Sequence, residues 1–546
     1  MKIALAQLNY HIGNFEDNTS KIIDSIQSAK DQGADLVVFA ELAVCGYPPR
    51  DFLEFDEFIE LCENAAQQIA AHCKDIACII GLPIKNTSPA GKDLHNAAYF
   101  IADGEVKSVV KKALLPTYDV FDEYRYFEPG MHFECIEFKG RKIALTICED
   151  LWNINDNPLY VSNPMDVLIE QDPDLMINIA ASPFSYSHDD ERMIVLADNA
   201  KKYNLPLLYV NQVGAQTELI FDGGSLAFNK EGLLLDEMPY FEEALRIYTI
   251  EGDEIQGYAP KSHQPSSDIE QIYQALILGI KDYFAKSGFK KAVLGLSGGI
   301  DSAIVCALAC RALGPENVMA VLMPSKYSSD HSIDDALDLV RNFGCKHEVI
   351  PIKEAADAFD GMMAAAFDGL PFNLAEENIQ ARCRGIVVMA MSNKFGYILL
   401  NTSNKSECAV GYGTLYGDMC GAIGVIGDVY KTQVYELAQY INKDGMMIPE
   451  NSIVKPPSAE LRPGQKDSDS LPDYDTLDKI LFQYIELKKS SAAIIGQGYD
   501  EALVRRIIKM VNTAEFKRYQ TPPILRVSPK AFGMGRRMPI VGKYLS

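Results

Sequence analysis

The chain has 546 residues, more than one hydrophobic core usually serves, so at least two domains are expected. Its 75 acidic and 51 basic side chains give a net charge of −24, which opposes binding to nucleic acid or to an anionic membrane surface. Small-molecule substrates are therefore expected. No stretch has the length and hydropathy of a membrane span, and the N-terminus lacks the pattern of a secretory signal.

The twelve cysteines form no CxxC pair, so a reducing cytoplasm is the expected compartment. Cys306 and Cys310 lie in an apolar helical pattern, where free cysteine acts as a small hydrophobe.

Short β-branched runs alternate with amphipathic stretches from Met1 to about Tyr258, beginning with KIALAQL, NTSKIIDSIQSAKDQG and ADLVVFAE. This alternation predicts a layered α/β fold. The stretch GYAPKSHQPSSD, residues 257–268, breaks both the helical and the strand periodicity. We therefore predict two domains, 1–258 and 269–546, joined by a linker at 259–268.

The second half continues with a helix and then with strand–turn–helix units, in which AVLGL is followed by SGGIDS, and VMAVLMP and KHEVIPI come later. This pattern predicts a second domain with a parallel sheet. The polar segment 462–478 is predicted to be either a mobile surface loop or a lid over a site.

The motif SGGIDS lies between an apolar strand and an apolar helix, at the positive end of the helix, where phosphate binds readily. Gly298 and Gly299 let the backbone approach an anion closely, and Ser297 and Ser302 add hydroxyl donors. Asp301 can hold a magnesium ion against the phosphates. A turn of this kind can also be no more than a helix N-cap, but the complete motif in this context favours nucleotide binding.

SGGIDS, in a chain without GxxxxGK[ST], resembles the pyrophosphate loop of the ATP pyrophosphatase superfamily, whose members adenylate a substrate and release pyrophosphate. The run 401–437 resembles the corresponding block of NAD synthetases. This resemblance implies ATP as a co-substrate and Mg²⁺ at Asp301 and Glu407. It also implies further contacts to ATP, from Met323, Arg382 and Thr402, and to deamido-NAD, from Gln380, Lys431 and Thr432.

The first half offers the groups that a thiol amidase needs, which are a nucleophile, a base and a cation for the oxyanion. Cys148 closes the strand KIALTIC, and Glu41 follows the strand LVVFA. Lys111 and Lys112 would face opposite sides of a strand, so the residues alone leave the choice between them open. Each of these residues, taken singly, is typical of a structural or surface position.

The ordered segments FAELAVCGYPPRD, KKALLPTYDVFDEYRYFEPG and LTICEDLW resemble the Glu, Lys, Cys triad of the nitrilase superfamily. The resemblance selects Lys112 and implies Glu41 as general base, Lys112 as oxyanion stabiliser and Cys148 as nucleophile. It also implies Glu123 as a supporting carboxylate and glutamine contacts from Tyr118, Ser182 and Arg192. The implied fold is an α-β-β-α sandwich followed by a Rossmann-like parallel-sheet domain.

A nitrilase-type amidase fused to an SGGxDS ligase resembles the glutamine-dependent NAD synthetases. This implies that glutamine-derived ammonia, ATP and deamido-NAD are converted to NAD, AMP and pyrophosphate, and a homo-oligomer is expected. Two alternatives remain: another amidotransferase with a different acceptor, and a non-catalytic nucleotide-binding protein that keeps the amidase fold as a scaffold. The presence of all the triad and metal residues disfavours the second.

Overall fold

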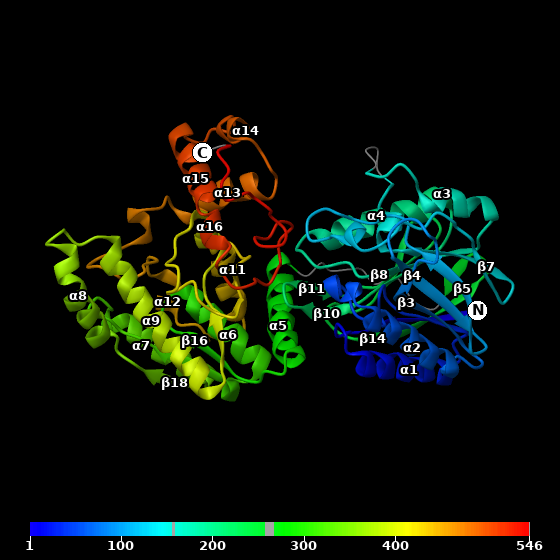
Figure 1. Ribbon diagram of the computed structural model, residues 1–546, viewed down its shortest axis with the longest axis horizontal. Coiled ribbons are helices and arrows are strands. Elements are labelled where there is room, and N and C mark those ends of the chain that lie inside the picture. Colours follow the sequence, from blue (N-terminus) through cyan, green and yellow to red (C-terminus); the bar gives the residue numbers. More distant parts are fainter. Residues whose placement is uncertain (155–158, 257–266, 545–546) are drawn as a thin grey trace. The chain divides into compact units, whose positions relative to one another are not determined.

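The computed structural model describes residues 1–154, 159–256 and 267–544. The chain divides into two compact units, Met1–Pro265 and Ser266–Ser546 (Figure 1). The predicted linker 259–268 lies outside the described residues up to position 266, and helix α5 begins at its last residue, Asp268. None of the described helices is both long enough and apolar enough to cross a membrane.

Two sheets and a small hairpin form the strands of the first unit. The first sheet has the spatial order β15 (Glu254–Gln256), β14 (Ala244–Glu251), β1 (Lys2–Gln7), β2 (Leu36–Val38), β3 (Ala77–Lys85), β4 (Leu94–Ala102) and β5 (Glu105–Lys111). The second has the order β13 (Leu234–Glu237), β12 (Leu226–Phe228), β9 (Leu207–Asn211), β8 (Leu175–Ala180), β7 (Arg141–Ile147) and β6 (Ile136–Phe138). The hairpin joins β10 (Val213–Gln216) to β11 (Leu219–Asp222).

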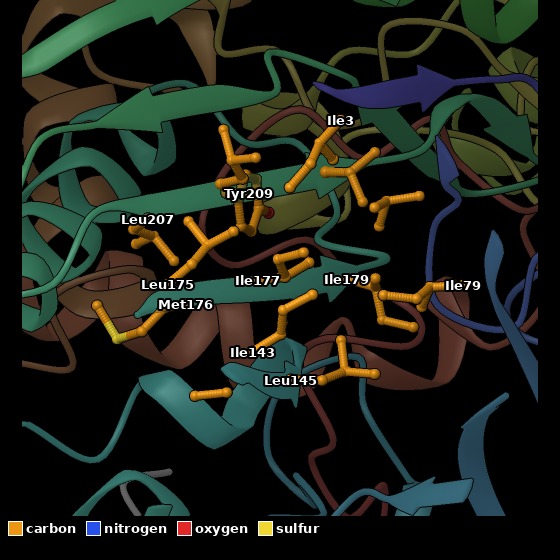
Figure 2. Packing of buried hydrophobic residues seen from close by; sticks show 14 of the residues in the cluster. Ile3, Ile79, Ile143, Leu145, Leu175, Met176, Ile177, Ile179, Leu207 and Tyr209 are labelled. Atoms are coloured by element: carbon orange, nitrogen blue, oxygen red, sulfur yellow. The ribbon is translucent and has the colours of Figure 1, made fainter. Parts of the chain in front are cut away.

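The core of this unit lies between the two sheets. Ile3 and Ile79 from the first sheet pack with Ile143, Ile177 and Leu207 from the second (Figure 2). Alternate residues of β1 and β2 point into this core, as the two-residue period of a strand requires.

Helices cover the outer faces of both sheets. Helices α1 (Phe15–Asp31) and α2 (Asp56–His72) contact the first sheet, and α3 (Pro164–Leu168) and α4 (His188–Tyr203) contact the second. The predicted α-β-β-α sandwich is therefore confirmed.

The second unit contains a parallel sheet with the order β18 (Lys346–Val349), β17 (Val318–Leu322), β16 (Ala292–Gly295), β19 (Ile398–Asn401) and β20 (Ile423–Gly424). From β16 the chain continues to β17 and β18 on one side of the sheet. It then crosses back and adds β19 and β20 on the other side of β16. Adjacent loops after β16 and β19 therefore diverge at a topological switch point, where open α/β sheets bind ligands. The predicted Rossmann-like domain is confirmed.

Helices surround this sheet and continue past it to the C-terminus. Val388 of α9 packs on Val293, Val321 and Leu399 of the strands. The helices are α5 (Asp268–Lys286), α6 (Ile300–Leu313), α7 (Asp330–Phe343), α8 (Lys353–Phe367), α9 (Leu374–Phe395), α10 (Lys405–Val410), α11 (Lys431–Ile441), α12 (Glu450–Val454), α13 (Tyr474–Ile485), α14 (Ser491–Ile495), α15 (Glu501–Thr513) and α16 (Glu515–Arg518).

The close packing between the two sheets predicts that a cavity in this core would destabilise the first unit. Ile79 is fully buried in that core, so Ile79→Ala should lower the free energy of unfolding of the first unit by about 2–5 kcal/mol. Chemical denaturation followed by tryptophan fluorescence isolates this unit, because Trp152 is the only tryptophan in the chain. Ile194→Ala is the control, since Ile194 is 61% exposed on α4. Equal unfolding midpoints for the two variants would contradict the assigned core.

Candidate active sites

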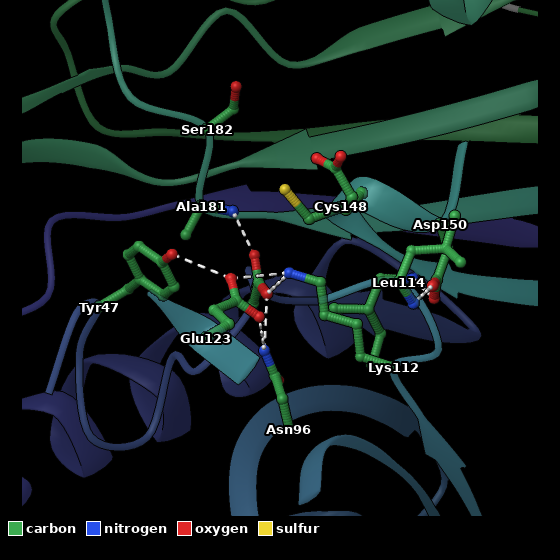
Figure 3. A network of polar contacts seen from close by, with 12 residues as sticks. Tyr47, Asn96, Lys112, Leu114, Glu123, Cys148, Asp150, Ala181 and Ser182 are labelled. Atoms are coloured by element: carbon green, nitrogen blue, oxygen red, sulfur yellow. Dashed lines mark hydrogen bonds and ion pairs between the residues drawn. The ribbon is translucent and has the colours of Figure 1, made fainter. Parts of the chain in front are cut away.

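Three of the predicted catalytic residues lie just beyond strand ends in the first unit (Figure 3). Glu41 follows β2, Lys112 follows β5, and Cys148 follows β7. The last strand ends one residue earlier than predicted, so Cys148 begins the short 3-10 helix η3 (Cys148–Leu151) with a φ of 45°. A residue other than glycine in this left-handed backbone conformation indicates a constrained turn, and such turns are common at catalytic positions.

The ammonium group of Lys112 joins two carboxylates. Its Nζ donates to Glu41 Oε1 at 2.7 Å and to Glu123 Oε1 at 2.9 Å, and all three side chains are buried. Glu41 Oε1 also accepts from Asn96 Nδ2 at 2.7 Å, and Glu41 Oε2 accepts from Ala181 N at 3.0 Å. The Glu41 carboxylate is therefore held in one orientation by three donors. Lys111, by contrast, is only half-buried, which agrees with the choice of Lys112.

Burial and charge set the protonation of this cluster. Burial opposes the charged form of Lys112, but Glu123 and Glu41 outweigh it and raise the lysine pKa well above its ordinary value. Burial, opposed by Lys112, raises the pKa of Glu123 to about 7. Burial and the carboxylate of Glu41 raise the pKa of the Cys148 thiol well above its ordinary range. The raised pKa favours the protonated thiol of Cys148, and a base would have to accept this proton for Cys148 to act as a nucleophile.

Two acids follow Cys148 and have different surroundings. Asp150 accepts hydrogen bonds from the backbone N–H groups of Ala113, Leu114 and Ile147 at 2.9–3.0 Å, which ties the Lys112 segment to the Cys148 turn (Figure 3). Asp150 therefore has a positioning role.

Glu149 instead faces two tyrosine hydroxyls. Tyr118 and Tyr160 both donate to its carboxylate at 3.0 Å. Burial raises the pKa of Glu149 to about 7, against the effect of Lys112 and of these hydrogen bonds. Glu149 is not among the site residues predicted from the sequence, so this carboxylate is an addition to the candidate site.

Only some of the predicted glutamine contacts lie near one another. Ser182 lies beyond the end of β8, and its hydroxyl is 3.1 Å from Nε2 of His188. The indole of Trp152 stacks on His188 with ring centroids 5.2 Å apart.

Arg192 differs from its prediction. Its guanidinium is buried and makes a forked pair with Asp222, at 3.0 and 2.8 Å. Because that fork already has a carboxylate partner, Arg192 is not retained as a substrate contact. The sequence could not reveal Asp222, which is 30 residues away.

A pocket of about 310 Å³ opens at the switch point of the second unit. It lies between the turn after β16 and the segment after β19, in agreement with the position expected for a nucleotide. The predicted residues that line it are Ser297, Gly299, Asp301, Ser302, Met323, Thr402, Glu407 and Lys431.

The turn after β16 is held in shape by its own serines. Ser302 Oγ donates to Gly299 O at 3.0 Å and is 3.2 Å from Ser297 Oγ. Gly298 has a φ of 78°, and an added Cβ would lie 2.1 Å from Ser332 O. A glycine is therefore required at this position, although Gly298 does not itself line the pocket.

Asp301 and Glu407 meet beside one lysine. The Lys431 ammonium makes an ion pair with Asp301 and lies 3.8 Å from Glu407 Oε1. Asn404 caps helix α10 by accepting from Glu407 N, and its Nδ2 donates to Asp301 Oδ1 at 2.9 Å. The backbone N–H of Asn404 donates to Glu407 Oε2 at 3.4 Å, so Asn404 contacts both carboxylates.

The charges of this group favour a cation. Burial and the carboxylate of Asp301 raise the pKa of Glu407 well above its ordinary value, while Lys431 opposes the shift. Asp467 also lines the pocket and acts on Glu407 in the same direction as Asp301. Adjacent carboxylates that destabilise one another suit a hard divalent ion with oxygen ligands, so these residues fit Mg²⁺.

Besides Gly298, three predicted contacts do not line the pocket, namely Gln380, Arg382 and Thr432. Arg382 is exposed and donates to Leu415 O, whereas Arg384 is half-buried, donates to Met323 O and lines the pocket. Gln380 donates to Leu461 O, and Thr432 donates its backbone N–H to Asp478. Residues two apart on a helix face different directions, so Arg384 is the better candidate for a nucleotide contact.

The segment 455–461 forms one wall of the pocket and was not predicted from the sequence. Lys455 Nζ donates to Ser332 Oγ at 3.0 Å, and Glu460 accepts from the same hydroxyl at 2.7 Å. Of the predicted loop 462–478, only Asp467 lines the pocket, and the loop's C-terminal part is the first turn of α13. Both segments contain prolines and polar residues, so the sequence did not distinguish the segment that forms a wall of the pocket from the other.

The comparisons with known proteins cover both units. The carbon-nitrogen hydrolase model matches residues 2–260, and the NAD synthase model matches residues 272–521. The solved structure of the glutamine-dependent NAD⁺ synthetase from Acinetobacter baumannii, in complex with adenosine diphosphate, is 39% identical with a TM-score of 0.79 and covers 100% of this chain and 99% of its own. A structure of the glutamine-dependent NAD⁺ synthetase from Cytophaga hutchinsonii, 21% identical, has the same fold, with a TM-score of 0.81 over 100% of this chain and 98% of its own.

Curated relatives are similar over their whole length. The glutamine-dependent NAD(+) synthetase of Acinetobacter baylyi is 43% identical over 99% of this chain and 98% of the relative. The glutamine-dependent NAD(+) synthetase of Synechocystis sp. is 48% identical over 98% of each chain. Because this identity extends across both units, the chain belongs to the glutamine-dependent NAD synthetase family.

Proposed function

We propose that this protein converts deamido-NAD to NAD, with ATP as co-substrate and glutamine as the nitrogen donor, and releases AMP, pyrophosphate and glutamate. One observation carries the proposal: a single chain contains a buried Glu–Lys–Cys amidase centre and an SGGIDS pocket with paired carboxylates. The two centres complement each other, because ammonia at neutral pH is mostly ammonium, which cannot attack an acyl adenylate, and a coupled amidase would supply unprotonated ammonia.

The amidase step follows from the contacts of Lys112. As Cys148 Sγ attacks the amide carbon of glutamine, Glu41 accepts the thiol proton and returns it to the departing ammonia. Two N–H groups of Lys112 donate to Glu41 and Glu123 within the described residues. The third is therefore available to the oxyanion that forms at the amide oxygen. Water, deprotonated by Glu41, then releases glutamate from the thioester.

Glutamine recognition is assigned to the groups near the nucleophile. The carboxylate of Glu149, oriented by Tyr118 and Tyr160, would hold the α-ammonium group. Ser182 and His188 offer adjacent donors for the α-carboxylate. Glu123 remains the supporting carboxylate, through its contact with Lys112.

In the second unit the turn 297–302 would hold the phosphates of ATP at the N-terminus of α6. Asp301 and Glu407 would hold Mg²⁺, which neutralises charge on the phosphates and on the pyrophosphate leaving group. Lys431 contacts both carboxylates and would add a positive charge at the reacting phosphate. The adenylated carboxylate of deamido-NAD then accepts ammonia and releases AMP. A cytoplasmic, homo-oligomeric enzyme is part of the same proposal.

The division of labour predicts separable activities. Cys148→Ala should abolish NAD synthesis from glutamine but leave synthesis from high external ammonium near the wild-type rate, because only the ammonia source is lost. NAD and AMP are measured with deamido-NAD, ATP and magnesium present. Cys135→Ala, which replaces a half-buried cysteine elsewhere in the unit, should retain both activities. Loss of both activities in Cys148→Ala alone would contradict the proposal.

The environment of Glu149 predicts a pH-dependent affinity for glutamine. Since its pKa is raised to about 7, its charge is present above that pH and is lost as the pH falls through it. The KM for glutamine should therefore rise below pH 7. Glu149→Gln should raise KM at pH 8 by about 10–100-fold, the loss of one charge-assisted hydrogen bond, and remove its pH dependence.

Steady-state glutamate release measures this KM, and Glu170→Gln, at an exposed position, is the control. Only KM is compared between the pH values, because Glu123 also has a pKa of about 7 and its titration can change kcat. A Glu149→Gln enzyme with the wild-type KM at both pH values would remove Glu149 from the glutamine site.

The paired carboxylates predict a shared metal. Asp301→Asn and Glu407→Gln should each lower synthesis by about 100-fold or more with either nitrogen donor, since each removes charge from the metal site. They should also weaken binding of Mn²⁺, used as a spectroscopic probe for Mg²⁺. Asp338→Asn, an exposed change on α7, should do neither. Normal Mn²⁺ affinity in either variant would show that the replaced residue is not a ligand.

A further inference from the structure

Three buried cysteines of the second unit meet outside the pocket. Cys306 and Cys310 lie one turn apart on α6, and Cys345 lies between α7 and β18. The three Sγ atoms all lie within 4.8 Å of one another, and those of Cys306 and Cys345 are 3.9 Å apart. No step of the proposed reaction uses these thiols.

The spacing of the sulfurs fits ligands around one metal ion. Metal–sulfur bonds of ~2.3 Å at a tetrahedral angle place two sulfurs ~3.8 Å apart, close to the observed separation. A disulfide needs ~2.05 Å and uses only two of the three atoms. The cluster therefore matches a metal-bound arrangement with little movement, whereas a disulfide requires the helix and the turn to approach.

The local polarity also suits a soft cation. Cys310 is in the last turn of α6, where the carbonyl end of the helix favours positive charge. Cys310 and Cys345 are 5% and 6% exposed, so the cluster lies at the edge of the core and an ion has a short path to it.

We propose that Cys306, Cys310 and Cys345 form a binding site for one thiophilic d¹⁰ metal ion, separate from the catalytic centres. Soft thiolate ligands select ions of this class over Mg²⁺. Binding of a divalent ion forms three metal–sulfur bonds, breaks three S–H bonds and releases three protons to solvent. It would tie the middle and end of α6, the helix whose N-terminus carries Asp301, to the start of β18.

The probe is Cd²⁺, titrated into the full-length reduced protein without magnesium or nucleotide. Thiolate-to-cadmium charge-transfer absorption and competition with a chromophoric chelator give the number of ions bound. Other thiols, including Cys148, can bind Cd²⁺, so the result is read as a difference between proteins. Wild-type protein should bind about one more tightly held Cd²⁺ ion than Cys345→Ala protein. It should also release correspondingly more protons when Cd²⁺ binds.

Cys383→Ala is the matched control, because Cys383 is a buried cysteine of the same unit outside the cluster. It should bind Cd²⁺ like the wild type. Cys310→Ala, in a helix that tolerates alanine, should repeat the loss seen with Cys345→Ala and serves if that variant does not fold. Circular dichroism and ammonium-dependent synthesis check folding.

Equal Cd²⁺ stoichiometry and affinity in wild-type, Cys345→Ala and Cys310→Ala proteins would overturn the proposal. So would a thiol count two below the expected number in denatured, unreduced protein together with its restoration in Cys345→Ala, because that pattern identifies a disulfide at the cluster.

Discussion

A buried lysine between two carboxylates organises each candidate active site. Lys112 joins Glu41 and Glu123 in the first unit, and Lys431 lies beside Asp301 and Glu407 in the second. Removing such ions from water costs several kcal/mol for each, and only mutual pairing offsets that cost. The lysine therefore permits two acids to lie close together, buried in the first unit and partly buried in the second, and the acids keep the lysine charged.

The two lysines are suited to different chemistry because their surroundings differ. Lys112 lies beside the Cys148 thiol, so its charge would suit an oxyanion formed there (Figure 3). Lys431 borders a pocket with a phosphate-binding turn, where its neighbours fit a metal ion and a nucleotide. A third buried lysine, Lys405, pairs with Asp428 and Glu486 and lines neither site, so pairing alone does not indicate catalysis. Lys431 differs from Lys405 because it lines the pocket, and Lys112 differs because its ammonium group lies beside the Cys148 side chain (Figure 3).

The order of the elements and their strand-end residues could be predicted from the sequence, because both depend on local patterns. Glu41, Cys148 and the turn 297–302 each follow an apolar strand, and such a strand can be located from its local pattern. Asn96 and Tyr47, which donate to the acids of the cluster, carry no local signal for that role.

Some side chains have surroundings that the sequence could not reveal, because their partners lie far away along the chain. Arg192 reads as a binding group from its local sequence, but it is buried and paired with Asp222. Arg382 and Arg384 differ only in the direction that the helix gives them. Likewise, Cys306 is a small core residue by its local pattern, and Cys345, 39 residues later, makes it part of a cluster.

The central claim, that the two centres carry out one reaction, is tested most directly by the fate of the glutamine nitrogen. The protein is incubated with glutamine labelled with ¹⁵N in its amide, deamido-NAD, ATP and magnesium, and the products are analysed by mass spectrometry. The account predicts NAD that carries the label, formed together with AMP and glutamate. Glutamate and labelled ammonia without labelled NAD, in protein that binds ATP and deamido-NAD, would contradict it.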